Sequence, residues 1–143
     1  MNTTYIARQQ KDTKWYIIDA KNKNLGRLSS QIAQLLKGKN SASYTPYINH
    51  KIYIILINSK LIQVTGKKFT QKTYKQYSGY PGGLKSRKFS YILSQKPNMI
   101  LEKSIKGMLP KGILGRKLFT QLKIYSDNKH PHQPQKPEVI TVI

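Results

Sequence analysis

Cysteine is absent from this 143-residue chain, and acidic residues are scarce. Without thiols the chain can form no disulfide and offers no thiolate nucleophile or metal ligand. The five carboxylates lie far apart in the sequence, at Asp12, Asp19, Glu102, Asp127 and Glu138. That spacing shows no carboxylate pair for acid–base chemistry, and no G-x-S-x-G nucleophile motif is present. The sequence therefore predicts that the protein is not an enzyme.

Long hydrophobic runs are also missing. The longest apolar stretch, IYIILI at residues 52–57, is far shorter than the ~20 residues that span a bilayer. The N-terminal sequence MNTTYIARQQKDTKW has no apolar core of a secretory signal and is poor in the Ser and Arg of transit peptides. We therefore expect the protein to act in the compartment where it is made.

Positive charge dominates what is present. The chain has 26 Lys and Arg residues against five acids, a formal net charge of +21 and a pI near 10.2. A compact protein of this charge repels itself, so we expect a polyanionic partner. Nucleic acid is favoured because phosphate contacts release condensed counterions. The alternatives are a simply solvated basic surface and an anionic membrane, although no segment strongly resembles a membrane-binding amphipathic helix.

Hydrophobic periodicity predicts strands alternating with helices. Strands are expected at residues 15–19, 52–57, 61–64 and 122–125. Helices are expected at 25–37, from Phe89, from Pro97 to Met108, and near 113–118. The pattern predicts one α/β domain with a central, mainly parallel sheet of about four strands flanked by helices. We divide the chain into an irregular N-terminal extension (1–14), an α/β RNA-binding domain (15–126) and an extended, Pro-containing tail (127–143).

Residues 67–88 are expected to form a long basic loop rich in Tyr and Gly. Basic groups interleaved with aromatic rings can neutralise phosphates and stack on bases at the same time. A flexible solvated loop is the alternative. The stretch Gly79-Tyr-Pro-Gly-Gly-Leu-Lys85-Ser86 nearly matches a nucleotide-binding P-loop, but Leu84 stands where that motif needs Gly. No apolar strand precedes it, so nucleotide binding is disfavoured.

Two further groups of residues are candidates for RNA contact. Lys106, Lys111 and Arg116 flank helix ends, where phosphate is readily held. His130 and His132 form the one close histidine pair, with a solvated tail as the alternative. Structural zinc needs about four ligands, which two histidines without Cys do not supply. The sequence predicts no metal site and no cofactor.

Nine sequence blocks together resemble the large ribosomal subunit protein 13 family of bacteria and plastids. Two of them, S-G-Y-P-G-G-L-K (78–85) and the K-G-M-L-P-K that ends I-L-E-K-S-I-K-G-M-L-P-K (100–111), are highly specific. The others are W-Y-I-I-D-A (15–20), L-G-R-L-S-S-Q-I-A-Q-L-L-K-G-K (25–39), T-P-Y-I (45–48), I-N-S-K-L-I-Q-V-T-G-K-K (57–68), L-G-R (114–116), L-K-I-Y (122–125) and H-P-H-Q-P-Q (130–135). The resemblance covers roughly residues 13–137.

The resemblance implies a structural constituent of the large ribosomal subunit that binds and organises large-subunit rRNA early in assembly. It implies neighbouring ribosomal proteins as partners, and neither a membrane nor a small-molecule substrate. An extra-ribosomal regulatory RNA-binding protein is the alternative function. By motif matching, the RNA-facing residues would be Arg27, Lys37, Lys39, Lys67, Lys68, Tyr77, Ser78, Gly79, Tyr80, Gly82, Gly83, Lys85, Lys106, Lys111, Arg116, His130 and His132.

The sequence departs from the family at two places. Asn49-His50-Lys51-Ile52 replaces an acidic turn of the form D-x-G-D, and Tyr77 stands where His is frequent. The preference for Lys over Arg and for Ile over Val indicates AT-rich coding, which is typical of plastid genomes and of some bacteria. We expect a ribosomal protein of the plastid (chloroplast) stroma, with the bacterial cytoplasm as the alternative.

Overall fold

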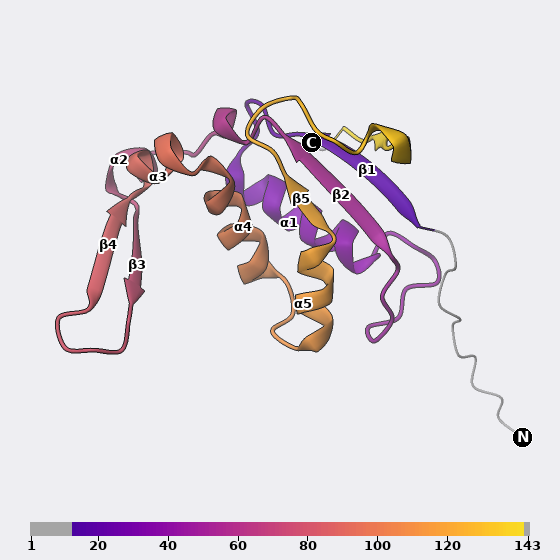
Figure 1. Cartoon of the computed structure of the whole chain (residues 1–143). Helices are drawn as coiled ribbons and strands as arrows, with labels where there is room; N and C mark the ends of the chain where they lie inside the picture. The colour runs from indigo at the N-terminus through magenta and orange to yellow at the C-terminus, as the bar shows by residue number, and fades with distance from the viewer. Residues whose placement is uncertain (1–12, 142–143) are drawn as a thin grey trace, which may run out of the picture.

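A four-stranded parallel sheet forms the centre of the molecule (Figure 1). The computed structural model describes residues 13–141. The strand order is β5–β2–β1–β6, and each neighbouring pair is parallel. The strands are β1 (Lys14–Asp19), β2 (Ile52–Ile57), β5 (Leu122–Ile124) and β6 (Glu138–Val139). The predicted α/β class with a mainly parallel sheet is confirmed, and most of the predicted N-terminal extension lies outside the described residues.

Helices α1 (Leu25–Lys37) and α4 (Pro97–Met108) pack side by side against the sheet (Figure 1). The apolar stripe of α1, at Leu28, Ile32 and Leu36, is buried because these positions recur at helical spacing on one face. Gly38 ends α1 in the left-handed conformation, with φ of 72°, as expected of a glycine after a helix. Pro97 occupies the first turn of α4, where its missing N–H costs no hydrogen bond.

Two shorter helices precede and follow α4 in the chain. They are α3 (Phe89–Gln95) before it and α5 (Ile113–Thr120) after it, both at predicted positions. Phe89 in α3 and Leu118 in α5 have almost no exposed surface and join the same core as Ile54 and Leu56 of β2. Within residues 13–141, no helix combines the length and apolar character needed to cross a membrane.

The C-terminal tail adds a strand to the sheet. After β5 the chain passes through the 3-10 helix η2 (Gln133–Gln135) and pairs with β1 as β6, where the amide of Ile140 also donates to the carbonyl of Ile17. The tail lies beside β1 in yellow in Figure 1. His132 reaches the Trp15 ring, whose centroid is 5.3 Å away. The tail is thus attached to the sheet, a pairing that its Pro-containing sequence did not predict.

The predicted strand at residues 61–64 is wrong. Asn58 turns the chain in the left-handed region, and Ser59–Leu61 form the 3-10 helix η1. Only an isolated bridge between Gln63 and Asn24 remains of the expected pairing. Ile62 is buried because it packs into the core from this loop, so its apolar character does not reflect a strand. The fourth strand of the sheet is β6 instead.

The prediction of an irregular loop at residues 67–88 is also wrong. This segment forms the short helix α2 (Lys68–Gln71) and the strands β3 (Thr73–Tyr77) and β4 (Leu84–Lys88). β3 and β4 make an antiparallel two-stranded sheet of their own, separate from the central one. Figure 1 shows this hairpin extending away from the body of the domain. Its side chains are nearly all exposed, so the sequence carries no apolar alternation that would have revealed it.

Candidate nucleic-acid interface

The basic hairpin, residues 73–88, has a well-defined turn at its tip. Tyr77 pairs with Leu84, and the amide of Gly83 donates to the carbonyl of Tyr80 over 2.9 Å. Pro81 and Gly82, which has φ of 72°, occupy the two central positions, as in a type II turn. A Cβ at Gly83 would overlap the hydroxyl of Ser78, so the turn is closed too tightly there for a side chain. The motif Tyr-Pro-Gly-Gly therefore shapes the tip.

Aromatic packing holds the base of the hairpin to the core. The Tyr74 ring stacks on the buried Phe89 at 6.4 Å, and Phe69 meets Phe89 edge-on at 6.0 Å. The amide of Phe89 also donates to the carbonyl of Lys72 over 2.8 Å. Burial raises the pKa of Tyr74 above its ordinary value. These contacts fix where the arm leaves the domain.

The tip presents exposed rings beside cations. Tyr77 is 62% and Tyr80 75% exposed, and Leu84 is 57% exposed. Because side chains alternate between the faces of a hairpin, Lys85 and Arg87 share one face, while Lys75 and Lys88 share the other. Both faces are therefore basic. A single strand of nucleic acid could meet phosphate-binding cations and stacking surfaces on either side.

The hairpin disfavours nucleotide binding by a P-loop. Such a loop follows a buried strand and opens a helix, so that the backbone amides surround the phosphates. Here Gly79 lies in an exposed turn, and Lys85 and Ser86 lie in strand β4. The near match to the motif is thus a coincidence of spacing, consistent with Leu84 replacing its second glycine.

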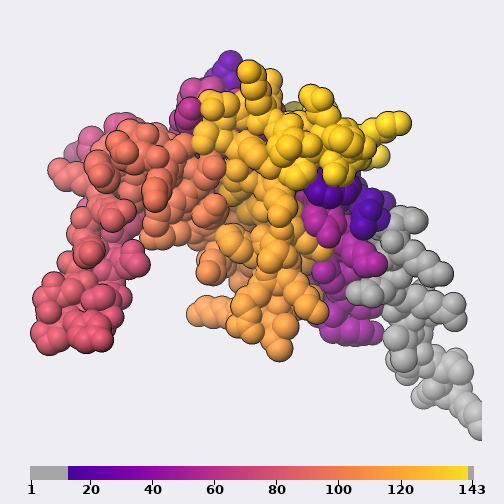
Figure 2. Space-filling model, viewed as in Figure 1, coloured from indigo at the N-terminus to yellow at the C-terminus, as the bar shows by residue number. Residues whose placement is uncertain are grey.

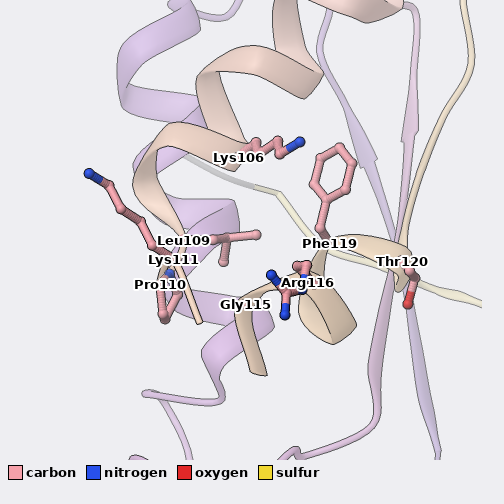
Figure 3. A pocket seen from close by; sticks show the side chains of 8 residues that line it. All are labelled: Lys106, Leu109, Pro110, Lys111, Gly115, Arg116, Phe119 and Thr120. Atoms are coloured by element: carbon pink, nitrogen blue, oxygen red, sulfur yellow. The ribbon is translucent and has the colours of Figure 1, made fainter. Parts of the chain in front are cut away.

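A second basic cluster surrounds a hollow between the end of α4 and α5, here called the α4–α5 pocket. The cations are Lys106, Lys111 and Arg116, and the apolar wall is formed by Leu109 and Phe119. Pro110, Gly115 and Thr120 complete its lining (Figure 3). The ammonium of Lys106 lies 5.6 Å from the centroid of the Phe119 ring. The pocket thus combines an aromatic surface with three positive charges.

The remaining candidates are spread over the surface. Arg27 and Lys37 lie on α1, and Lys39 follows its end. Lys67 precedes α2 and Lys68 begins it, close to the base of the hairpin. In Figure 2 the hairpin stands as an arm beside the body, with a hollow between it and the α4–α5 end. The predicted residues therefore form several basic areas, since the arm separates its tip from the body.

His130 and His132 belong to an aromatic cluster on the central sheet. Trp15 stacks on Tyr53 at 4.5 Å, and His132 lies against the Trp15 ring. Nε2 of His132 is 2.8 Å from the hydroxyl of Tyr125 and shares a hydrogen bond with it. Burial, then the nearby charges of His130 and Lys123, lowers the pKa of His132. These contacts give His132 a structural role, whereas RNA contact by either histidine remains a prediction.

Acidic groups do little to offset the positive charge of these basic areas. Among residues 13–141 the one ion pair joins Lys60 to Asp127 at 2.9 Å, and both side chains are more than half exposed. Asp19 accepts hydrogen bonds from the amide of Lys21 and from the side chain of Asn58, so its carboxylate caps the turn after β1. In the same part of the chain, no three His, Asp or Glu residues gather to hold a metal ion. The cations are therefore available to an external anion.

Sequence reasoning missed several cations around the hairpin. Lys75, Arg87 and Lys88 lie on its strands, and Lys72 lies at its base. Lys103 comes from α4, and its ammonium lies 5.2 Å from the Tyr74 ring. The paired segments TYKQY and LKSRK around a Pro-Gly turn were the available signal for the strands. Nothing in the local sequence could have placed Lys103 there, because its contact is tertiary.

Comparison with known proteins gives one consistent result. A family model described as Ribosomal protein L13 matches residues 13–131. The chain is 73% identical over 143 residues to the large ribosomal subunit protein uL13c of Gracilaria tenuistipitata var. liui, covering 100% of each chain. It is 53% identical to uL13c of Porphyra purpurea, over 96% of this chain and 97% of that one. It is 48% identical to uL13 of Acaryochloris marina (strain MBIC 11017), over 99% and 95%.

Proposed function

The chain belongs to the ribosomal protein L13 family, and from this membership we propose that it is a structural constituent of the large ribosomal subunit. In this role it binds and organises large-subunit rRNA, early in assembly. The observation that carries the proposal is the basic hairpin, an exposed arm with cations on both faces and stacking rings at its tip. An arm of this kind suits insertion between RNA segments, because it buries little of its own surface until RNA surrounds it.

The proposed contacts are those predicted by motif matching. Lysines and arginines neutralise phosphates, while Tyr77 and Tyr80 stack on unpaired bases. The glycines of the tip let the backbone approach RNA closely, because they carry no side chain. The α/β RNA-binding domain at 15–126 supplies most of these residues, and the tail at 127–143 supplies His130 and His132. We propose no catalytic role, no cofactor and no small-molecule substrate.

The relatives include plastid-type (uL13c) and bacterial-type (uL13) proteins. We therefore place the protein on ribosomes of the plastid stroma, with the bacterial cytoplasm as the alternative. Neighbouring proteins of the large subunit are further partners in this proposal. The stronger identity to the uL13c proteins favours the plastid.

Sedimentation of a native extract through a high-salt sucrose gradient tests this function. Merely electrostatic adherence is removed by salt, because binding falls steeply as counterions compete. We expect the chain to remain with the large subunit at about one copy per particle. Its release to the top of the gradient, together with a specific messenger bound to the released protein, would instead support an extra-ribosomal regulatory role.

A further inference from the structure

The α4–α5 pocket differs from the basic hollow lined by Lys67, Lys68 and Lys72 because it has an aromatic wall. Its volume is about 520 Å³, within the range of about 300–1,000 Å³ that is usual for small-ligand sites. Figure 3 shows the Lys106 side chain extending toward the Phe119 ring, with Leu109 and Arg116 pointing into the same space. Phosphate neutralisation alone requires neither a hollow nor a ring.

We propose that the α4–α5 pocket receives one unstacked nucleotide of a bound RNA. Its base lies against Phe119 and Leu109, and its flanking phosphates are held by Lys106 and Arg116. This inference rests on the proposed function, since it assumes that RNA is the partner. It goes further because it assigns this surface to a base, whereas the proposed function requires only phosphate contacts there.

Charge complementarity identifies the occupant as an anion. Three cations line the pocket and no acidic residue does. An uncharged ligand would leave these cations unmatched. An acidic peptide would match the charge, but its carboxylates offer nothing flat to cover the Phe119 ring. A nucleotide supplies both a phosphate and a planar base, which stacks on aromatic rings regardless of its identity.

The contact between Lys106 and Phe119 does not block the ring. Lys106 is exposed, and an exposed ammonium over a ring is held only weakly. Base stacking on an aromatic side chain is generally the stronger interaction. An entering base therefore displaces the ammonium, which can then turn on its flexible stem toward the adjacent phosphate.

The pocket is also formed before any ligand arrives. A Cβ at Gly115 would overlap the carbonyl oxygen of Pro110, so α5 lies directly on the turn that follows α4. Leu118, one residue before Phe119, is buried in the core and fixes the orientation of this helix. Because both walls are held by packing, little ordering of the protein opposes binding.

The test measures binding of the full-length chain to two single-stranded probes of nine units. One is oligouridylate, and the other is an abasic ribose-phosphate oligomer with the same number of phosphates. The Kd of the abasic oligomer divided by the Kd of oligouridylate, called the base ratio, rises with contacts to bases. We expect Phe119→Leu to lower the base ratio by roughly fivefold or more. The salt slope, by which the logarithm of the binding constant falls with the logarithm of the salt concentration, should be unchanged. Tyr91→Leu, an exposed ring on α3 outside the candidate set, should leave the base ratio unchanged.

Arg116→Met keeps an apolar stem but removes a charge, so it should lower the salt slope with both probes by roughly 0.7. If Phe119→Leu does not fold, the test instead follows the NMR amide resonances of Leu109, Gly115 and Thr120 in the unmodified chain as each probe is added. These should shift with oligouridylate and much less with the abasic probe. Equal shifts, or an unchanged base ratio in folded Phe119→Leu, overturn the pocket proposal while leaving the proposed function intact.

Two other outcomes are informative. If the unmodified chain shows no salt-dependent binding to either probe, the proposed function fails, and the pocket proposal fails with it. If oligoglutamate of nine residues displaces oligouridylate as effectively as unlabelled oligouridylate does, the pocket recognises charge alone. That result would overturn the assignment of the pocket to a nucleotide and would favour an acidic peptide.

Discussion

At the scale of single residues, Gly38 joins the end of α1 to a buried turn. Its φ is 72°, a conformation that disfavours side chains. His50, only 2% exposed, packs directly against it, and a Cβ at Gly38 would overlap the imidazole ring. Gly38 is thus required both by its backbone conformation and by its neighbour.

We expect Gly38→Ala to lower the free energy of unfolding by about 2–4 kcal/mol, the sum of left-handed strain and overpacking. Gly66→Ala is the matched control, because Gly66 also has positive φ, 62°, but nothing lies near its missing Cβ. It should lose only about 1–2 kcal/mol. Urea denaturation of both variants measures the difference. Equal losses of unfolding free energy in the two variants would mean that the overlap of the new Cβ with His50 costs nothing.

The sequence predicted one of these two requirements. A glycine after an apolar stripe is a recognised helix terminus, so the end of α1 was predictable from Gly38 alone. The contact with His50 depends on how the intervening chain returns to the helix, which no local pattern describes. Similarly, the hydrogen bond that Asp19 accepts from Asn58 depends on the parallel pairing of β1 and β2.

At the scale of elements, the hairpin is a basic arm whose strands lie outside the core. Replacing Lys75, Lys85 and Arg87 by Gln should hardly alter the thermal unfolding midpoint, because these side chains are exposed. The same triple variant should lower the salt slope for single-stranded RNA by about two, since each phosphate contact contributes roughly 0.7. Binding isotherms at several salt concentrations measure this.

The control variant replaces Lys21, Lys129 and Lys136 by Gln. It removes the same charge from exposed positions outside the candidate set. A salt slope that falls equally in both triple variants would show that net charge, and not the hairpin, governs RNA binding. The comparison therefore distinguishes phosphate contacts made by the hairpin from a general attraction due to net charge.

The tail contains a pH-sensitive attachment. Because the pKa of His132 is lowered by burial and by the charges of His130 and Lys123, the folded tail favours the neutral imidazole. Stability from this contact is present above the ordinary His pKa of about 6.5 and is lost as pH falls through the lowered value. We expect the fluorescence of Trp15, which lies against His132, to change in that acidic range.

His132→Gln should remove this pH response, since an amide can still bond to the Tyr125 hydroxyl but does not titrate. The measurement is a pH titration of Trp15 fluorescence in the unmodified chain and in His132→Gln. The signal belongs to Trp15 alone, because the chain contains no other tryptophan. His130 also lies in this cluster, with its ring centroid 6.5 Å from that of His132. An undiminished response in His132→Gln would show that the His132 imidazole is not the source of the pH dependence.

At the scale of the whole molecule, the sequence predicted the parts whose chemistry is local. The apolar run of β2 and the stripes of α1 and α4 indicated a parallel sheet with helices packed on it. The hairpin escaped prediction because exposed strands need no apolar alternation, and β6 escaped because two residues suffice to pair with β1. Lys106, Lys111 and Arg116 were recognised individually, but the pocket they form with Phe119 depends on the packing of α5 against α4.

Net charge leads to the last prediction. With +21 formal charges and, among residues 13–141, a single exposed ion pair, the free chain is destabilised by its own repulsion. Salt screens that repulsion, since the Debye length falls from about 10 Å at 0.1 M to 3 Å at 1 M. We therefore expect the unfolding midpoint of the free chain to rise between low and moderate salt, while its affinity for RNA falls. Sodium chloride and sodium perchlorate should act alike at low ionic strength, because screening does not depend on the identity of the ion. Calorimetry of the RNA-free chain tests this, and an unfolding midpoint that falls with both salts would show that self-repulsion is not what limits its stability.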